Sequence, residues 1–380
     1  MRIKLGKTRI VMRGPMFPSI ARFADGSLMI GAASVEEHSP IISIRSEDGG
    51  DRWRPYTPSL PTGAAHTVWQ LHNGPALALS VYTQPLAGEA GWYATTRWES
   101  DDNWRTVRGP LSDGRLYLPP DRFDATKNQW FHGNVIEMPN GDLLSALQEF
   151  HVASGSRVYL CRSTDRGVNW HFVAEVASFA TIDDPQGVTR QGWALWGPCE
   201  PNIAHVGGGR LICVMRLVND DRAPLLGPPM ETYHDLSDTI SGAEIYRSGL
   251  PADRYFSPGP PSVPLVISHS ADGGQTWSPA TPLAEACGCQ PRLAQSDGIL
   301  ALTFGALAFP RWGNCITCSD DGGRTWSEKV QFGPYLTTGY TGVVAIAPRH
   351  FLCVFDCTPP QPWLNHAAHW VGVVDVEVNG

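Results

Sequence analysis

The sequence lacks the features that mark several classes of protein. It has no run of about eighteen apolar residues, the length needed for a membrane-spanning helix. Apolar residues do not recur at helical spacing over long segments, which excludes a mainly helical fold. There is no basic stripe, and the net charge is −8, so nucleic acid is not an expected partner. Residues 1–14 carry charges where a signal peptide needs an apolar core, which predicts a cytoplasmic protein without a membrane partner.

The cysteines do not form a disulfide pattern either. There are nine, an odd number without scaffold spacing, which suits a reducing compartment. Cys287 with Cys289, and Cys315 with Cys318, approach metal-ligand spacing but lie among apolar strand residues. Buried thiols explain them better than zinc, and no two histidines have zinc-ligand spacing. The sequence therefore predicts no metal and no cofactor.

What the sequence does contain is turns, with 39 glycines and 32 prolines in 380 residues. Five segments share the pattern S-x-D-x-G-x-[TN]-W, the Asp-box: Ser46–Trp53, Ser163–Trp170, Ser270–Trp277, Ser319–Trp326 and a shorter copy, Ser100–Trp104. The Ser and Asp side chains can bond turn backbone, the Gly accepts a positive φ, and the Trp can fill an apolar gap. Recurrence about every fifty residues predicts a repeat architecture.

A second repeat alternates with the first. Six short turns each separate two apolar runs, as in a β-hairpin: Asp25-Gly26, Asn73-Gly74, Asn140-Gly141, Gly208-Gly209, Asp297-Gly298 and Pro348–His350. Four strands per repeat and six repeats predict an all-β, six-bladed β-propeller of four-stranded antiparallel blades, one domain over 1–380. The N-terminal strand would join the last blade and close the ring. Residues 217–263 form a long insertion in blade 4, either a lid or a surface loop without function.

This topology places the hairpins and the Asp-boxes on one face of the disc. The opposite face collects residues that precede first strands or follow second strands. They are Glu36, Glu37, His38, His66, His132, Glu149, His151, Glu200, Arg216, Asp220, Asp221, Gln290, Arg311, Tyr340 and Asp356. A dense polar pocket near an axis is therefore expected on that face.

The chemistry of this face points to an anionic sugar. Arg216 and Arg311 could bind a planar carboxylate through paired guanidinium forks, or form a structural ion network with nearby aspartates. A tyrosine hydroxyl has a pKa near 10, so Tyr340 becomes a nucleophile only if a carboxylate such as Glu200 takes its proton. A plain strand tyrosine is the alternative. His38, His132 and Glu149 are candidates for contacts with sugar hydroxyls.

The same residues resemble those of the sialidase (neuraminidase) superfamily, in which Asp-boxes repeat. Residues 199–216 are similar to its E-x(4–6)-L-x-D-G-R-x-L-x(3)-R segment, which implies that Glu200 is the base partner and Arg216 binds a carboxylate. Residues 308–311 are similar to the segment with the last arginine of a triad, and Gly339-Tyr340-Thr341 resembles the Gly-Tyr-Ser of the nucleophile. The resemblance implies a glycosidase with a Tyr nucleophile.

Two positions depart from that pattern. Met16 stands where the superfamily has the first arginine of the triad, and Glu36, Glu37 and His38 stand where it has an acidic Asp. A pair of arginines holds a sialic acid carboxylate less well than three, which argues against true sialidase activity. We expect a retaining exo-glycosidase acting on a terminal carboxylate-bearing sugar of an oligosaccharide or glycoside. Glu37 is the candidate acid/base, and Glu36 or His38 could serve in its place. A uronic-acid lyase and a non-catalytic glycan-binding propeller are the alternatives.

Overall fold

The computed structural model describes residues 1–33, 41–59, 68–124, 128–150, 156–184, 195–219, 264–306, 313–333, 339–357 and 369–379. The regular structure in these ranges is β-strand, with no α-helix and a single turn of 3-10 helix, η1 (Phe179–Thr181). Accordingly, this part of the chain offers no helix of the length and apolar character that a membrane crossing demands. The expectation of an all-β fold is confirmed.

The strands follow one another in six groups, which we call units 1 to 6. Units 1, 4 and 5 are four-stranded antiparallel sheets. Unit 1 comprises β3 (Met16–Arg22), β4 (Leu28–Ala33), β5 (Ile42–Ser46) and β6 (Arg54–Pro55). Unit 4 comprises β17 (Leu195–His205), β18 (Leu211–Asn219), β19 (Pro264–Ser270) and β20 (Thr281–Cys287). Unit 5 comprises β21 (Cys289–Ser296), β22 (Ile299–Ala306), β23 (Gly313–Ser319) and β24 (Val330–Gly333).

Units 2 and 3 share one curved sheet of ten strands. Unit 2 comprises β7 (Val68–Gln70), β8 (Ala76–Leu79), β9 (Gln84–Pro85), β10 (Trp92–Ser100) and β11 (Arg108–Tyr117). Unit 3 comprises β12 (Asn128–Trp130), β13 (Val135–Glu137), β14 (Leu143–Phe150), β15 (Arg157–Ser163) and β16 (Asn169–Ser178). The two units join because their outermost strands, β11 and β16, pair in parallel.

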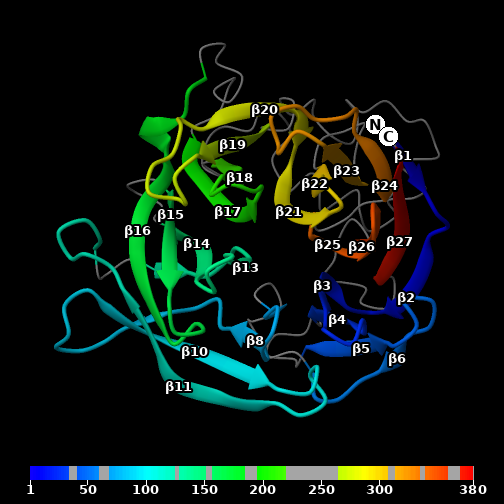
Figure 1. The fold of residues 1–380 in the computed structure, drawn as a ribbon, viewed down its shortest axis with the longest axis horizontal. Helices are drawn as coiled ribbons and strands as arrows, with labels where there is room; N and C mark the ends of the chain where they lie inside the picture. Colours follow the sequence, from blue (N-terminus) through cyan, green and yellow to red (C-terminus); the bar gives the residue numbers. More distant parts are fainter. Residues whose placement is uncertain are drawn as a thin grey trace, which may run out of the picture.

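Unit 6 contains both ends of the chain. Its strands β25 (Thr341–Ala347), β26 (His350–Cys357) and β27 (Trp370–Asn379) are joined by β1 (Arg2–Leu5) and β2 (Arg9–Arg13), which both pair antiparallel with β27. The two termini consequently lie side by side (Figure 1). The predicted pairing of the N-terminal segment with the last unit is confirmed, with two short strands in place of one.

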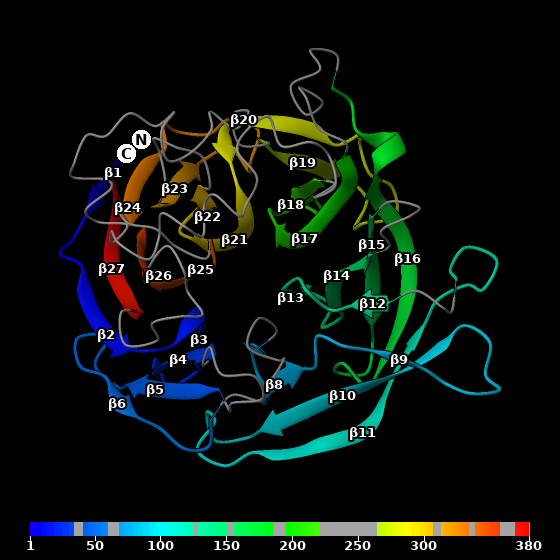
Figure 2. The ribbon, with the colours of Figure 1, turned by 180° about the vertical axis from the view of Figure 1, so that it is seen from behind.

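Apolar side chains between neighbouring units hold the units in a ring. Six buried clusters occur in the described residues, and each joins one unit to the next. The cluster that contains Leu28 and Ile30 of unit 1 also contains Leu352 and Val354 of unit 6, so the last unit packs against the first. Figures 1 and 2 show the sheets arranged around a common centre, with β3, β13, β17, β21 and β25 innermost. In unit 2 the innermost strand is β7, which pairs with β8 at the end of the sheet.

Each Ser-x-Asp repeat forms a turn between the third and fourth antiparallel strands of its unit; we call it the Ser-Asp turn. In the turn at Ser163, the Ser hydroxyl donates to Asp165 Oδ1 (2.8 Å) and accepts from Gly167 N (2.9 Å). The Trp170 ring is fully buried, and its Nε1 donates to Gly167 O (3.0 Å). The shorter copy keeps the bond from Ser100 to Asp102. The four full-length turns satisfy their own polar groups while packing a tryptophan against the core. In the shorter copy Trp104 is buried, but its Nε1 has no hydrogen-bond partner among the described residues.

The six predicted hairpin turns are also present, each between the first and second main strands of a unit. In unit 4, β18 continues to Asn219, where Leu195 is its partner. The first three residues of the predicted insertion at 217–263 belong to β18. Residues 220–263 lie outside the described part of the chain.

Candidate functional site

Three first strands share a proline bulge at the same place. The sequences are Met-Phe-Pro-Ser at 16–19, Cys-Glu-Pro-Asn at 199–202 and Cys-Gln-Pro-Arg at 289–292. In each, two residues oppose one residue of the next strand. The residue before the proline has a positive φ: 55° at Phe17, 45° at Glu200 and 50° at Gln290. Such strained positions in non-glycine residues are typical of functional sites, and a bulge redirects a side chain.

The Glu200 carboxylate is the centre of the site. It is buried, with 7% of its surface exposed, and Oε1 accepts from Arg216 Nη1 at 3.0 Å. Oε2 accepts from Gln290 N at 2.9 Å, and the backbone N of Glu200 donates to the Gln148 side chain. Burial alone raises the pKa of Glu200, but Arg216, His132 and the Gln290 N–H lower it further than burial raises it. Glu200 is therefore an ionised acceptor in the resting protein.

Tyr340 lies beside this carboxylate, just before β25. Its ring contacts Phe17 edge to face, with centroids 4.8 Å apart, and Phe17 N donates to Asp356 Oδ2 at 2.9 Å. Burial, followed by the Glu200 charge, raises the pKa of Tyr340 well above its ordinary value, while Arg216 and Arg292 oppose that rise. The hydroxyl is thus protonated at neutral pH, and it lies within range of the Glu200 charge.

His132 belongs to the same cluster. Burial lowers the pKa of His132 to about 4. The charges of Arg292 and Arg216 also lower this pKa, whereas the charge of Glu200 raises it. The imidazole is therefore neutral at pH 7, and it can exchange a hydrogen bond with a hydroxyl but cannot supply a proton as an imidazolium acid.

Arg292 is a further charged residue that the sequence reasoning did not single out. It follows the proline of the third bulge, and only 9% of its surface is exposed. With the Gln290 amide nitrogen directed at Glu200 Oε2 (3.1 Å), the Gln290 amide oxygen accepts from Arg292 Nη2 (2.6 Å). Burial lowers the pKa of Arg292 to about 10, although Tyr340 and Glu200 raise it. Gln290 thus links Arg292 to the central carboxylate.

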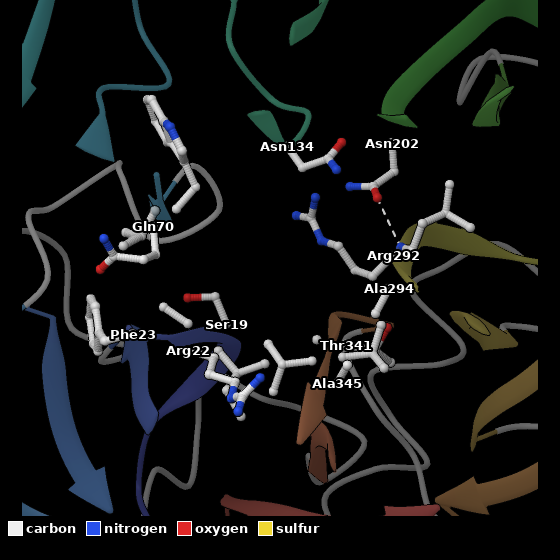
Figure 3. Close-up of a pocket in the computed structure, with 18 of the residues that line it drawn as sticks. Ser19, Arg22, Phe23, Gln70, Asn134, Asn202, Arg292, Ala294, Thr341 and Ala345 are labelled. Carbon is white, nitrogen blue, oxygen red and sulfur yellow. Dashed lines mark hydrogen bonds between the residues drawn. The ribbon is translucent and has the colours of Figure 1, made fainter. Parts of the chain in front are cut away.

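Below this cluster a cavity of about 590 Å³ extends between the first strands of all six units. Arg292, Asn202 and Thr341 lie at its end near Glu200, while Ala24 and His72 lie near the hairpin turns. Figure 3 shows the Arg292 side chain crossing from β21 toward Asn202 and Asn134.

The structure places four of the predicted site residues in one cluster: Tyr340, Glu200, Arg216 and His132. Arg216 is the charge partner of Glu200, and 32% of its side chain remains exposed. Three aspartates were the alternative partners of the two arginines. Asp220 and Asp221 lie outside the described residues, and Asp356 Oδ2 accepts from Phe17 N.

Glu149 belongs elsewhere. It pairs with Arg157 Nη2 at 2.8 Å, and only 3% of its side chain is exposed. Its strand neighbour Gln148 faces Glu200, so alternation along β14 directs Glu149 to the other side of the sheet.

The remaining predicted site residues, Glu37, His38 and Arg311, lie outside the described residues, as do Glu36, His66 and His151. Within the described ranges, no three His, Cys, Asp or Glu side chains are grouped as metal ligands.

Some of what was missed left a signal in the sequence. A proline two residues after Met16, Cys199 and Cys289 recurs in three first strands, and it marks Arg292 as the counterpart of Asn202. Gln148 gave no such signal, because its contact with Glu200 crosses from unit 3 to unit 4.

No family model matches the sequence, and no curated protein matches it. Solved structures are similar along nearly the whole chain. A protein of unknown function from Dyadobacter fermentans aligns with a TM-score of 0.65 and 16% identity over 99% of both chains. A Hadza microbial sialidase aligns at 0.60 and 16%, covering 95% of this chain and 65% of that one. An α-L-arabinofuranosidase from Fusarium graminearum aligns at 0.57 and 13%, over 98% of both chains.

At these identities the likeness shows the fold alone. The chain has an all-β fold that is shared with glycosidases, including a sialidase and an arabinofuranosidase. It spans about two thirds of the sialidase's length and almost all of the arabinofuranosidase.

Proposed function

We propose that the protein is a retaining exo-glycosidase that removes a terminal carboxylate-bearing sugar, with Tyr340 as nucleophile and Glu200 as its base. In this proposal the six units are the blades of a six-bladed propeller forming one domain, and the Ser-Asp turns are Asp-boxes. The observation that carries the proposal is the buried Glu200 carboxylate coupled to the Tyr340 hydroxyl, within a glycosidase-like fold.

The proposed first step joins Tyr340 Oη to the anomeric carbon while the bond to the leaving oxygen breaks. The phenolic proton passes to Glu200, and an acid in the 36–38 segment, Glu37, protonates the leaving group. Because the pKa of Glu200 is lowered and that of Tyr340 is raised, the proton moves only as the new C–O bond forms. The charges of Arg216 and Arg292 favour the oxygen that loses the proton.

The second step reverses these roles. Water attacks the anomeric carbon and gives a proton to Glu37, while the Tyr340 oxygen leaves and takes its proton back from Glu200. Two displacements at one carbon retain its configuration.

Substrate recognition is proposed to rest on cationic and hydrogen-bonding groups around this centre. Arg216 uses one nitrogen for Glu200 and, with its exposed remainder, joins Arg311 in binding the carboxylate. His132, as a neutral imidazole, and His38 bind sugar hydroxyls. Glu149 does not contact the sugar in this proposal, because its carboxylate is paired with Arg157. Its contribution is limited to supporting its strand neighbour Gln148, which contacts Glu200.

The test is hydrolysis of a panel of aryl glycosides of acidic and neutral sugars. We expect turnover of an acidic glycoside, and a loss of at least about 1,000-fold in kcat for Tyr340→Phe with an unchanged melting temperature. Nuclear magnetic resonance of the first-formed product should show the substrate's own anomer. Full activity of Tyr340→Phe would refute the nucleophile.

Two results would replace hydrolysis with another function. An unsaturated sugar product, identified by its new C=C bond rather than by release of the aryl group, would identify a lyase instead. Binding of acidic sugars without any turnover would identify a glycan-binding protein.

A further inference from the structure

A buried arginine and a buried amide direct hydrogen-bond donors into the same end of the axial cavity. Arg292 and Asn202 occupy equivalent places in neighbouring units, each directly after the bulge proline. Their exposed fractions are 9% and 1%. Figure 3 shows the Arg292 guanidinium and the Asn202 amide facing each other at the cavity wall.

The orientation of the Asn202 amide is fixed by the backbone. Its Oδ1 accepts from Leu293 N at 2.9 Å, so its Nδ2 must be the group directed at the cavity. Among the described residues, that Nδ2 has no protein acceptor. Ser19 Oγ and Trp69 Nε1, which also line the cavity, likewise have none, and Gln70 Oε1 lacks a donor.

The charge of Arg292 has little compensation from the described protein groups. No ion pair joins its guanidinium to a carboxylate in those ranges, and the acid that acts on it is Glu200. The two oxygens of Glu200 are already taken by Arg216 and by Gln290. A buried cation without a partner carries a large desolvation cost, which an added negative charge would offset.

We propose that Arg292 and Asn202 form a binding site for a monoanion in the axial cavity, adjoining the Glu200–Tyr340 centre. A halide suits it through charge and two converging N–H donors, and a sugar carboxylate presents the same chemistry. The anion would sit beneath the cluster and keep Arg292 charged. This goes beyond the proposed glycosidase activity, because the site is complete in the resting protein without substrate.

The first experiment compares melting temperatures in sodium bromide and in sodium tetrafluoroborate, a monoanion that accepts hydrogen bonds poorly, at equal ionic strength. For the wild type we expect a saturable rise of at least about 2 °C that is specific to bromide. Asn202→Asp keeps the Oδ1 acceptor but places a carboxylate beside Arg292. We expect the melting temperature of this variant to be independent of bromide. In halide-free buffer we expect it to be higher than the melting temperature of the wild type.

Two arginine variants complete the set. Arg292→Met should also lose the response, without needing an anion to remain folded. Arg22→Met, at an exposed arginine on the opposite end of the same cavity, should keep the wild-type response. If Asn202→Asp responds to bromide as the wild type does, or if tetrafluoroborate stabilises equally, the proposal is wrong.

The second experiment locates the anion directly. Crystals soaked in bromide should show an anomalous peak within hydrogen-bond distance of Arg292 and Asn202. Peaks only at exposed positions would overturn the site. Adding glucuronate, with glucose as the neutral control, distinguishes the sources: displacement of bromide identifies a sugar carboxylate as the natural occupant, and its retention identifies a free anion. Either result is independent of turnover, so failure of the glycosidase proposal leaves this test intact.

Discussion

The Glu200 carboxylate is held by groups from three other strands, so its position does not depend on its own rotamer alone. Arg216 from β18 and Gln290 from β21 donate to its two oxygens, and Gln148 from β14 holds its backbone N–H. A base that must receive a proton at a defined moment gains from such fixation, because little reorganisation is then required during the reaction. The same bonds make the carboxylate a weak base at rest, which ties proton transfer to bond formation.

Removing Arg216 should lower the stability of the protein, because the Glu200 carboxylate would then be buried without a positive charge beside it. We expect Arg216→Met to destabilise the protein by about 2–4 kcal/mol, because Glu200 stays buried without its charge partner. Arg216→Met combined with Glu200→Gln should recover most of that loss, and the cycle should give a coupling of about 1–3 kcal/mol. Urea unfolding measures the stability of each variant and hence the coupling energy, with Arg210→Met, at an exposed arginine, as the control. Additive effects of the two substitutions would contradict the pairing.

His132 should make stability depend on pH within one window. Its folded pKa is about 4, against an ordinary value of 6.5. Between these values the unfolded chain binds a proton that the folded protein excludes, so stability falls as pH decreases from about 6.5 to about 4. The loss is on the order of 3 kcal/mol. The difference in unfolding free energy between wild type and His132→Gln should be flat above pH 7 and shrink through the window. A difference that is constant from pH 4 to 8 would contradict it.

At the level of elements, the Ser-Asp turns and the proline bulges have different roles. The Ser-Asp turns close the outer strands and satisfy their own polar groups. The proline bulges, present in units 1, 4 and 5, redirect Phe17, Glu200 and Gln290 at the start of the innermost strands. The turns therefore support stability, and the bulges shape the site.

A Ser-Asp turn can be tested at Ser163, whose side chain is fully buried. Ser163→Ala removes the acceptor for the Gly167 and Asp165 N–H groups and the donor to Asp165. We expect a loss of about 1–3 kcal/mol, since buried donors are left without partners. Ser112→Ala, at an exposed strand position, should stay within about 0.5 kcal/mol. Equal effects of both substitutions in urea unfolding would show that the turn bonds add nothing.

The order of strands and turns could be predicted from the sequence because each turn is determined by residues that are close together in the chain. Ser163 and Asp165, or Asn140 and Gly141, fix a turn through neighbours within a few residues. Contacts between units have no such local code. Gln148 approaches Glu200 from 52 residues away, and Glu149 is turned from the site by strand alternation that register alone decides. Arg292 was missed because its burial arises only when six first strands surround one axis.

For the whole molecule, closure of the ring depends on the pairing of the chain's two ends. β1 and β2 cover different halves of β27, with Ile3 opposite Val378 and Ile10 opposite Gly372. Met12 from β2 is buried with residues of units 1 and 6. Without these strands β27 would be a bare edge, which is open to pairing with another chain.

Graded deletions should show how much of the stability this closure supplies. Deleting residues 1–6 removes β1 and leaves its partners in β27, residues 376–379, without a neighbouring strand. Deleting residues 1–13 also removes β2, and with it Met12 from the core. We expect the melting temperature to fall by a few degrees in the first case and by more than about 10 °C in the second. Size-exclusion chromatography should show self-association of the shorter form through the open edge of β27. Replacing the exposed Ile10 by Ala is the matched control for losing a side chain from β2 without losing the strand. A 1–13 deletion as stable and as monomeric as the full chain would mean that the packing of unit 6 on unit 1 closes the ring unaided.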